Sequence, residues 1–186
     1  MLDSILHPIK FPPYSSLKSY EGQGNWAIGK YYKLPYRPFY RKKLYMIRDM
    51  LDKGRIYKNI MDFGSGPGIF SHELRKHAIS VTSVDRADII DHRWKFECIV
   101  AGSTFEFIEK LPMTFLNIYR AASPKSQLIV ASPMDTKLTR AYFKLIGDNL
   151  VRNSHETICT IMDKWFQIDE YKEWNGLYFV AKGYKR

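Results

Sequence analysis

Cysteine is scarce in this chain of 186 residues, with only Cys98 and Cys159 present. Two cysteines set far apart within apolar patterns exclude a disulfide framework, and we expect both to be reduced core residues. The five histidines share no ligand spacing, so the sequence predicts no metal site. No apolar run reaches membrane-spanning length, and the N-terminus lacks an apolar stretch of signal length. We therefore expect a cytoplasmic protein without a membrane span.

Acidic residues are also in short supply, mainly in the N-terminal third. The chain has 29 Lys/Arg against 19 Asp/Glu, and residues 1–61 alone hold 12 against 4. Ten of the 28 aromatic residues precede position 46. Cations and rings together suit nucleic acid, but a solvated lid with a small core of its own is the simpler interpretation. The net charge of +10 indicates an anionic partner without choosing among RNA, a phosphorylated metabolite and a glycan.

Hydrophobic periodicity predicts one domain, with an irregular basic and aromatic arm over 1–36 and a core over 37–186. The expected fold class is α/β, a doubly wound and mostly parallel sheet with a C-terminal antiparallel hairpin. The hairpin should turn at Asn175-Gly176, and Asn153 with Glu156 should form a capping box. The expected strands are 57–63, 79–84, 96–101, 127–132, 166–171 and 177–182. The expected helices are 38–54, 68–77, 112–122, 136–150 and 154–164.

Glycine is concentrated in one turn, Asp62-Phe63-Gly64-Ser65-Gly66-Pro67-Gly68, between the first strand and its helix. With little side-chain bulk there, a ligand can lie against the backbone, where free N–H groups and the helix dipole point at it. Asp85 follows the next strand, 21 residues after Gly64. A nucleotide fold places its ribose-binding carboxylate at about this distance.

The glycine spacing excludes the dinucleotide fingerprint G-x-G-x-x-G, because Ile69 stands where the third glycine belongs. The pattern present, G-x-G-x-G with Asp62 before it, resembles motif I of the class I S-adenosylmethionine-dependent methyltransferases. The resemblance implies a Rossmann-like fold with S-adenosyl-L-methionine as cofactor, small-molecule acceptors, and Asp85 as the ribose-binding acid. It places the cofactor among the following residues: Asp62, Gly64, Ser65, Gly66, Pro67, Gly68, Asp85, Arg86, Ala101, Gly102 and Ser103.

Later segments resemble the same family. They are the fourth strand and its loop (96–103), the short segment after it (104–108), and the helix, proline turn and fifth strand (115–130). The chain departs from the family at Phe107, where a histidine is usual, and at Lys125-Ser126, where two glycines are usual. Only 11 positions separate Asp85 from Phe96. The middle of the fold is therefore shortened, and the adenine-binding residues are not identified.

Several of these residues have a plainer interpretation. Asp62 could cap the turn, Asp85 could be an ordinary strand-end acid, and Ser103 an ordinary loop residue. Glu106, His92 and His155 are the acid–base candidates, and for each a surface or capping role is the alternative. The remaining basic candidates have structural interpretations: His72 and His77 as surface or packing residues of the glycine-turn helix, and Arg41-Lys42-Lys43 as a solvated helix face.

Methyl transfer from a sulfonium is an in-line displacement, in which the protein mainly positions donor and acceptor. Ala101-Gly102-Ser103-Thr104 replaces the Asn/Asp-Pro-Pro-Tyr/Phe motif of enzymes that methylate base amines, so oxygen or carbon is the expected acceptor atom. The predicted function is methyl transfer to a small or medium-sized acceptor. The candidate walls of the acceptor site are Trp26, Tyr31, Tyr32, Lys137 and Arg140. The alternatives are an RNA-directed methyltransferase that docks through its basic N-terminal third, and a non-catalytic scaffold.

Overall fold

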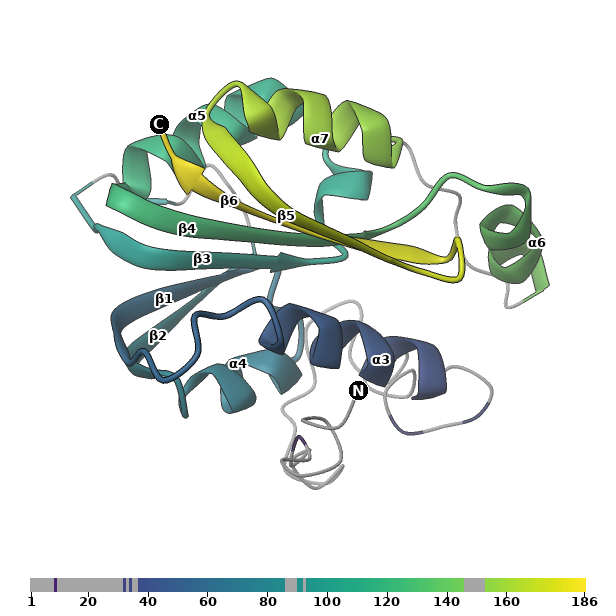
Figure 1. The fold of residues 1–186 in the computed structure, drawn as a ribbon, viewed down its shortest axis with the longest axis horizontal. Coiled ribbons are helices and arrows are strands. Elements are labelled where there is room, and N and C mark those ends of the chain that lie inside the picture. Colours follow the sequence, from purple (N-terminus) through teal and green to yellow (C-terminus); the bar gives the residue numbers. More distant parts are fainter. Residues whose placement is uncertain are drawn as a thin grey trace.

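The computed structural model describes residues 9, 32, 34, 37–85, 90–91, 93–145 and 153–186. Within them six strands form one sheet in the order β2-β1-β3-β4-β6-β5 (Figure 1). The first four are parallel, β6 runs antiparallel to β4, and β5 antiparallel to β6. The strands are β1 (Tyr57–Phe63), β2 (Ala78–Val84), β3 (Phe96–Gly102), β4 (Ala122–Pro133), β5 (Phe166–Trp174) and β6 (Tyr178–Lys185).

Helices cover both faces of this sheet (Figure 1). On one face lie α3 (Arg37–Arg48) and α4 (Ile69–Leu74), whose apolar side chains share a core cluster with Ile60, Val100 and Ile129. On the other lie α5 (Leu111–Ala121), α7 (His155–Asp163) and the 3-10 turn η3 (Phe105–Phe107), packed on Met61, Ile99 and Val130. Successive strand residues thus alternate between two cores, as expected of a sheet buried on both faces.

The predicted fold class is confirmed, including the terminal hairpin. Asn175 and Gly176 both have positive φ, 49° and 65°, the backbone of a tight two-residue hairpin turn. Cys98 and Cys159 are free thiols as expected, the first buried and the second half-buried. None of the described helices is long and apolar enough to cross a membrane.

Several element boundaries differ from expectation. Helix α3 ends at Arg48, before Leu51, and α4 ends at Leu74, so His77 lies in the turn before β2 rather than on the helix. The helix expected over 136–150 is described as α6 (Lys137–Leu145), and 146–152 lie outside the described residues. Strand β4 begins at Ala122, five residues before the expected start.

The predicted capping box is wrong. The N-cap of α7 is Ser154, whose Oγ accepts the Thr157 backbone N–H. The Asn153 side chain instead donates to the Phe105 and Ile108 carbonyls, and its backbone N–H donates to the Glu106 carbonyl. Asn153 therefore fixes the turn η3 against the start of α7.

Candidate cofactor site

The glycine turn joins the C-terminal end of β1 to α4 and makes two different uses of its glycines. Gly64, Gly66 and Gly68 all have positive φ, 74°, 50° and 74°, which side chains disfavour. A Cβ on Gly64 would lie 1.9 Å from Thr104 Oγ1, so packing against the loop after β3 requires glycine there. A Cβ on Gly66 or Gly68 would meet nothing within 4 Å. These two glycines leave open the cradle that a backbone-bound ligand would fill.

Asp85 lies beside this turn, as the 21-residue spacing predicts. Its Oδ1 accepts the Gly66 backbone N–H at 2.9 Å and the Ser65 hydroxyl at 3.4 Å. The carboxylate thus stands at the edge of the cradle, directly after β2. This placement suits a ribose-binding acid, and that role of Asp85 stays a prediction. Arg86 lies outside the described residues, so its role in cofactor binding also stays a prediction.

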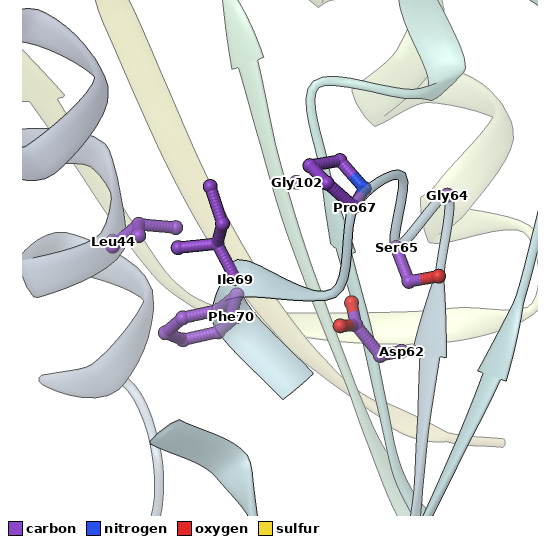
Figure 2. A pocket seen from close by; sticks show the side chains of 8 residues that line it. All are labelled: Leu44, Asp62, Gly64, Ser65, Pro67, Ile69, Phe70 and Gly102. Atoms are coloured by element: carbon purple, nitrogen blue, oxygen red, sulfur yellow. The ribbon is translucent and has the colours of Figure 1, made fainter. Parts of the chain in front are cut away.

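A small cavity opens between the turn and α3 (Figure 2). Its lining comes from α3, β1, the turn, α4 and the end of β3: Leu44, Asp62, Gly64, Ser65, Pro67, Ile69, Phe70 and Gly102. Five of the eight are predicted cofactor residues, and Leu44, Ile69 and Phe70 are additions. The sequence predicts that Leu44 lies on the apolar face of α3. The sequence pattern does not indicate that this face packs against the glycine turn.

Ala101 and Gly102 lie on opposite sides of the sheet. The Ala101 side chain is buried in the core cluster beneath α5 and α7, away from this cavity. Gly102 lines the cavity, and a Cβ there would lie 3.2 Å from Ile47 of α3. Of these two predicted residues, only Gly102 therefore lines the cavity.

Asp62 is buried beneath the turn, and its carboxylate serves both the fold and the cavity (Figure 2). The Ser71 hydroxyl of α4 donates to it, and Ser71 in turn lies 2.9 Å from the Ser83 hydroxyl. Burial, together with the nearby Asp85 charge, raises the pKa of Asp62 to about 6 against the opposing effects of Ser71 and Lys43. A carboxyl with this pKa titrates just below neutral pH.

This burial predicts that the stability of wild type falls relative to that of Asp62→Asn as the pH rises. A raised carboxyl pKa favours folding at low pH, and this contribution is lost as the pH rises through the folded-state value of about 6. Between about pH 4.5 and pH 8 the unfolding free energy of wild type should fall by about 2 kcal/mol relative to Asp62→Asn. Urea unfolding of both proteins across this range measures the difference.

Asp135→Asn is the matched control for this experiment. Asp135 is half-buried, and its hydrogen bond from Arg140 lowers its pKa, so its contribution changes with pH in the opposite direction and weakly. If the difference in unfolding free energy between wild type and Asp62→Asn stays constant with pH, the pKa of Asp62 is not raised in the folded protein.

Lys43 is not part of a solvated face, contrary to the sequence-based interpretation. It is only 1% exposed, although its helix neighbours Arg41 and Lys42 are half-buried. Its Nζ donates to Ser103 Oγ at 2.8 Å. Ser103 is likewise no ordinary loop residue, since it holds a positive φ of 60° directly after β3. The helix pattern places Lys43 four residues from both Phe39 and Ile47, a spacing that could have identified it as inward-facing.

Glu106 is neither a surface nor a capping residue. It is 0% exposed, and its Oε2 accepts the Ser132 hydroxyl at 2.8 Å at the end of β4. Its Oε1 is buried with no hydrogen-bond partner among the described residues. Burial raises the pKa of Glu106, while its hydrogen bonds and the Lys43 charge lower it. Of the two acid–base candidates within the described residues, Glu106 is the one that lies among the cofactor-side residues.

The other candidates lie elsewhere. His155 begins α7, where its Nε2 lies 3.1 Å from Glu156 Oε1 and its ring packs on Phe179. Lys137 and Arg140 are exposed on α6, and Arg140 pairs with Asp135 at 2.7 Å. Tyr32 is half-buried and packs against the α3/α4 core, with the Arg41 guanidinium over its ring. Three further predicted residues lie outside the described part of the chain: His92, Trp26 and Tyr31.

The fold and this site define an α/β protein with a nucleoside-type cradle at the C-terminal ends of its parallel strands. A family model described as a methyltransferase domain matches residues 37–176, well over half of the chain. The chain therefore belongs to the methyltransferase-domain family, and it is an S-adenosylmethionine-dependent methyltransferase with a Rossmann-like fold. No curated protein sequence matches it.

Solved structures show the same fold at low sequence identity. The N-methyltransferase NodS from Bradyrhizobium japonicum, in complex with S-adenosylhomocysteine, has a TM-score of 0.66 at 15% identity, over 87% of this chain and 93% of that one. A possible histamine N-methyltransferase from Thermotoga maritima has a TM-score of 0.60 at 19% sequence identity, over 87% of this chain and 100% of that one. A phosphoethanolamine N-methyltransferase from Haemonchus contortus was solved with phosphomonomethylethanolamine and S-adenosylhomocysteine. It has a TM-score of 0.57 at 12% sequence identity, over 77% of this chain and 52% of that one.

Proposed function

We propose that this protein transfers the methyl group of S-adenosylmethionine to a small or medium-sized acceptor. The observation that carries the proposal is the open cradle at Gly66 and Gly68, bordered by Asp85 and roofed by α3. The donor supplies an activated methyl group on its sulfonium when bound. The backbone N–H groups of the turn would hold its amino-acid end, and the Asp85 carboxylate would accept its ribose hydroxyls.

The acceptor would approach between α3 and α6, two helices that contact each other through aromatic side chains. Phe39 of α3 lies 4.3 Å from the Tyr142 ring of α6 and 5.6 Å from the Trp174 ring at the end of β5. Aromatic side chains so placed suit a bounded pocket for a small organic molecule rather than an open docking surface. The structural neighbours support this class, since histamine and phosphomonomethylethanolamine in their names are both small molecules.

In this mechanism the chain contributes position and exclusion of water rather than a nucleophile. Holding donor and acceptor in line supplies most of the rate enhancement, since the methyl group is already activated. Acceptor oxygen or carbon is our proposal from the segment 101–104. Amines belong in any screen, because the neighbours named above are N-methyltransferases.

The test is a methyl-transfer screen that follows a binding measurement. Calorimetric titration should show binding of S-adenosylmethionine and of S-adenosylhomocysteine, with dissociation constants of about 1 μM to 1 mM. The protein is then incubated with methyl-labelled donor and separate pools of metabolites, RNA and protein. Label should appear in the metabolite pool. Label confined to RNA would establish the RNA-directed alternative, and absence of binding to either cofactor form would favour the scaffold.

A further inference from the structure

Lys43 reaches across the end of the sheet from one core to the other. Its helix packs on the face shared with α4, where Leu44 and Ile47 are buried beside Val100. Its ammonium group lies past the end of β3, on Ser103 Oγ, beyond the last residue of the strand. Lysine is among the residues that are almost never fully buried without a partner, so this burial calls for a compensating set of charges.

Two buried carboxyls provide that compensation. Asp62 at the end of β1 is surrounded by Ser71, Asp85 and Lys43, and Glu106 after β3 by Ser103, Ser132 and Lys43. In both cases the positive charge of Lys43 lowers the pKa of the carboxyl against the effect of burial. One buried cation therefore serves two buried acids, Asp62 on β1 and Glu106 on the turn η3.

The chain is built to hold this arrangement. Ser103 adopts φ of 60°, a conformation that is strained for a non-glycine residue and persists only where the surroundings impose it. Three hydrogen bonds from Asn153 fix the turn that carries Glu106. Ser132 then orients the Glu106 carboxylate through Oε2. The two carboxyls near Lys43 are thus positioned by elements other than α3.

We propose that Lys43, Ser103 and Glu106 form a latch that fastens α3 over the donor cavity and thereby sets the affinity for the cofactor. Leu44, the next residue of α3, lines that cavity, so the position of Lys43 determines where this wall stands. Lys43 acts here as a positioning residue, through helix α3. The inference rests on the proposed function, because it takes the cavity beside the glycine turn to be the donor site.

Removing one charge of the latch should weaken cofactor binding more than removing both charges. In Lys43→Met the buried carboxyls lose their counter-ion, whereas Lys43→Met/Glu106→Gln leaves fewer uncompensated groups. We expect Lys43→Met to weaken S-adenosylhomocysteine binding about tenfold or more. The double variant should bind about tenfold more tightly than the two single variants together predict, since residues in one network of charges and hydrogen bonds are coupled. Ser103→Ala, which removes only the hydroxyl, should give a smaller loss in the same direction.

The experiment is a double-mutant cycle on the full chain, read in two ways. One is calorimetric S-adenosylhomocysteine affinity, and the other is urea unfolding without ligand. Lys42→Met is the matched control, because Lys42 is the half-buried neighbour in the same helix. It should bind as wild type, and its cycle with Glu106→Gln should be additive. Hydrogen exchange of 37–48 with S-adenosylhomocysteine bound should show protection in wild type and Lys42→Met, and reduced protection in Lys43→Met.

The outcomes separate the latch from the function beneath it. Additive cycles for Lys43 and Glu106, or wild-type affinity in Lys43→Met, would overturn the latch even if the cofactor binds normally. A coupled unfolding cycle in a protein that binds no S-adenosylhomocysteine would instead overturn the proposed function, and with it the control of affinity. If Lys43→Met does not fold, Ser103→Ala carries the test, and wild-type affinity in that variant overturns the latch.

Discussion

Gly64→Ala is expected to destabilise the protein by about 3–5 kcal/mol, a large share of the stability of an ordinary domain. Two effects add. The new Cβ would lie 1.9 Å from Thr104 Oγ1 and 2.7 Å from Thr104 Cβ, and an L side chain at φ of 74° is strained even in open space. The loop after β3 must move away from the turn, which also distorts the donor cavity. Urea unfolding at neutral pH measures the loss.

Gly54→Ala separates the two effects. Gly54 has nearly the same φ, 73°, but a Cβ there would meet nothing within 4 Å. Its loss should be limited to the backbone strain of about 1–2 kcal/mol. Thr104→Gly removes all three atoms that the new Cβ would strike, so Gly64→Ala/Thr104→Gly should recover most of the difference. Equal losses for Gly64→Ala and Gly54→Ala would show that close packing on Thr104 does not constrain the turn.

The parts of the site that sequence predicted are those that local chemistry determines. Three glycines between an apolar strand and an apolar helix face determine the conformation of the turn from Gly64 to Gly68. Asp85 follows because a parallel neighbour strand of similar length must end beside the turn. The sheet was predictable for a related reason, since its strands are short apolar segments separated by turn residues. Each of these features needs information from fewer than about thirty consecutive residues.

The parts that sequence missed depend on contacts between distant elements. Lys43 is buried because of Ser103, 60 residues away, and Glu106 because of Ser132 and of Asn153, which belongs to the start of α7. Composition argues against both, since charged residues are normally exposed. The capping-box error has the same origin, because Asn153 is drawn away from its helix by the carbonyl groups of η3.

Burial of Lys43 also changes what the basic N-terminal third can do. The run Arg41-Lys42-Lys43 belongs to the basic N-terminal third through which an RNA-directed enzyme would dock, and its third member is turned into the protein. Arg41 also lies 5.7 Å from the Tyr32 ring. Phosphate binding needs cations that remain accessible to solvent. The structure therefore weakens the RNA-directed alternative at this helix, and it strengthens the interpretation of α3 as a wall of the donor site.

Asp85→Ala is expected to lower the affinity for S-adenosylmethionine about 100-fold. The carboxylate would lose two charge-assisted hydrogen bonds to the ribose hydroxyls, each contributing about 1.5–3 kcal/mol before water compensates in part. It would also release the Gly66 N–H and the Ser65 hydroxyl, which it now holds in the turn. Calorimetric titration with S-adenosylmethionine and S-adenosylhomocysteine measures the loss, which should be similar for both because the ribose is common to them.

Two variants isolate the ribose contact from general damage. Asp85→Asn keeps a carbonyl oxygen for the Gly66 N–H but lacks the charge, so its loss should be smaller, about tenfold. Asp49→Ala removes an exposed acid at the end of α3 that contacts Arg48, and it should bind as wild type. Wild-type affinity in Asp85→Ala, with unfolding unchanged, would remove Asp85 from the donor site. The cavity beside the glycine turn would then bind its ligand without the Asp85 carboxylate.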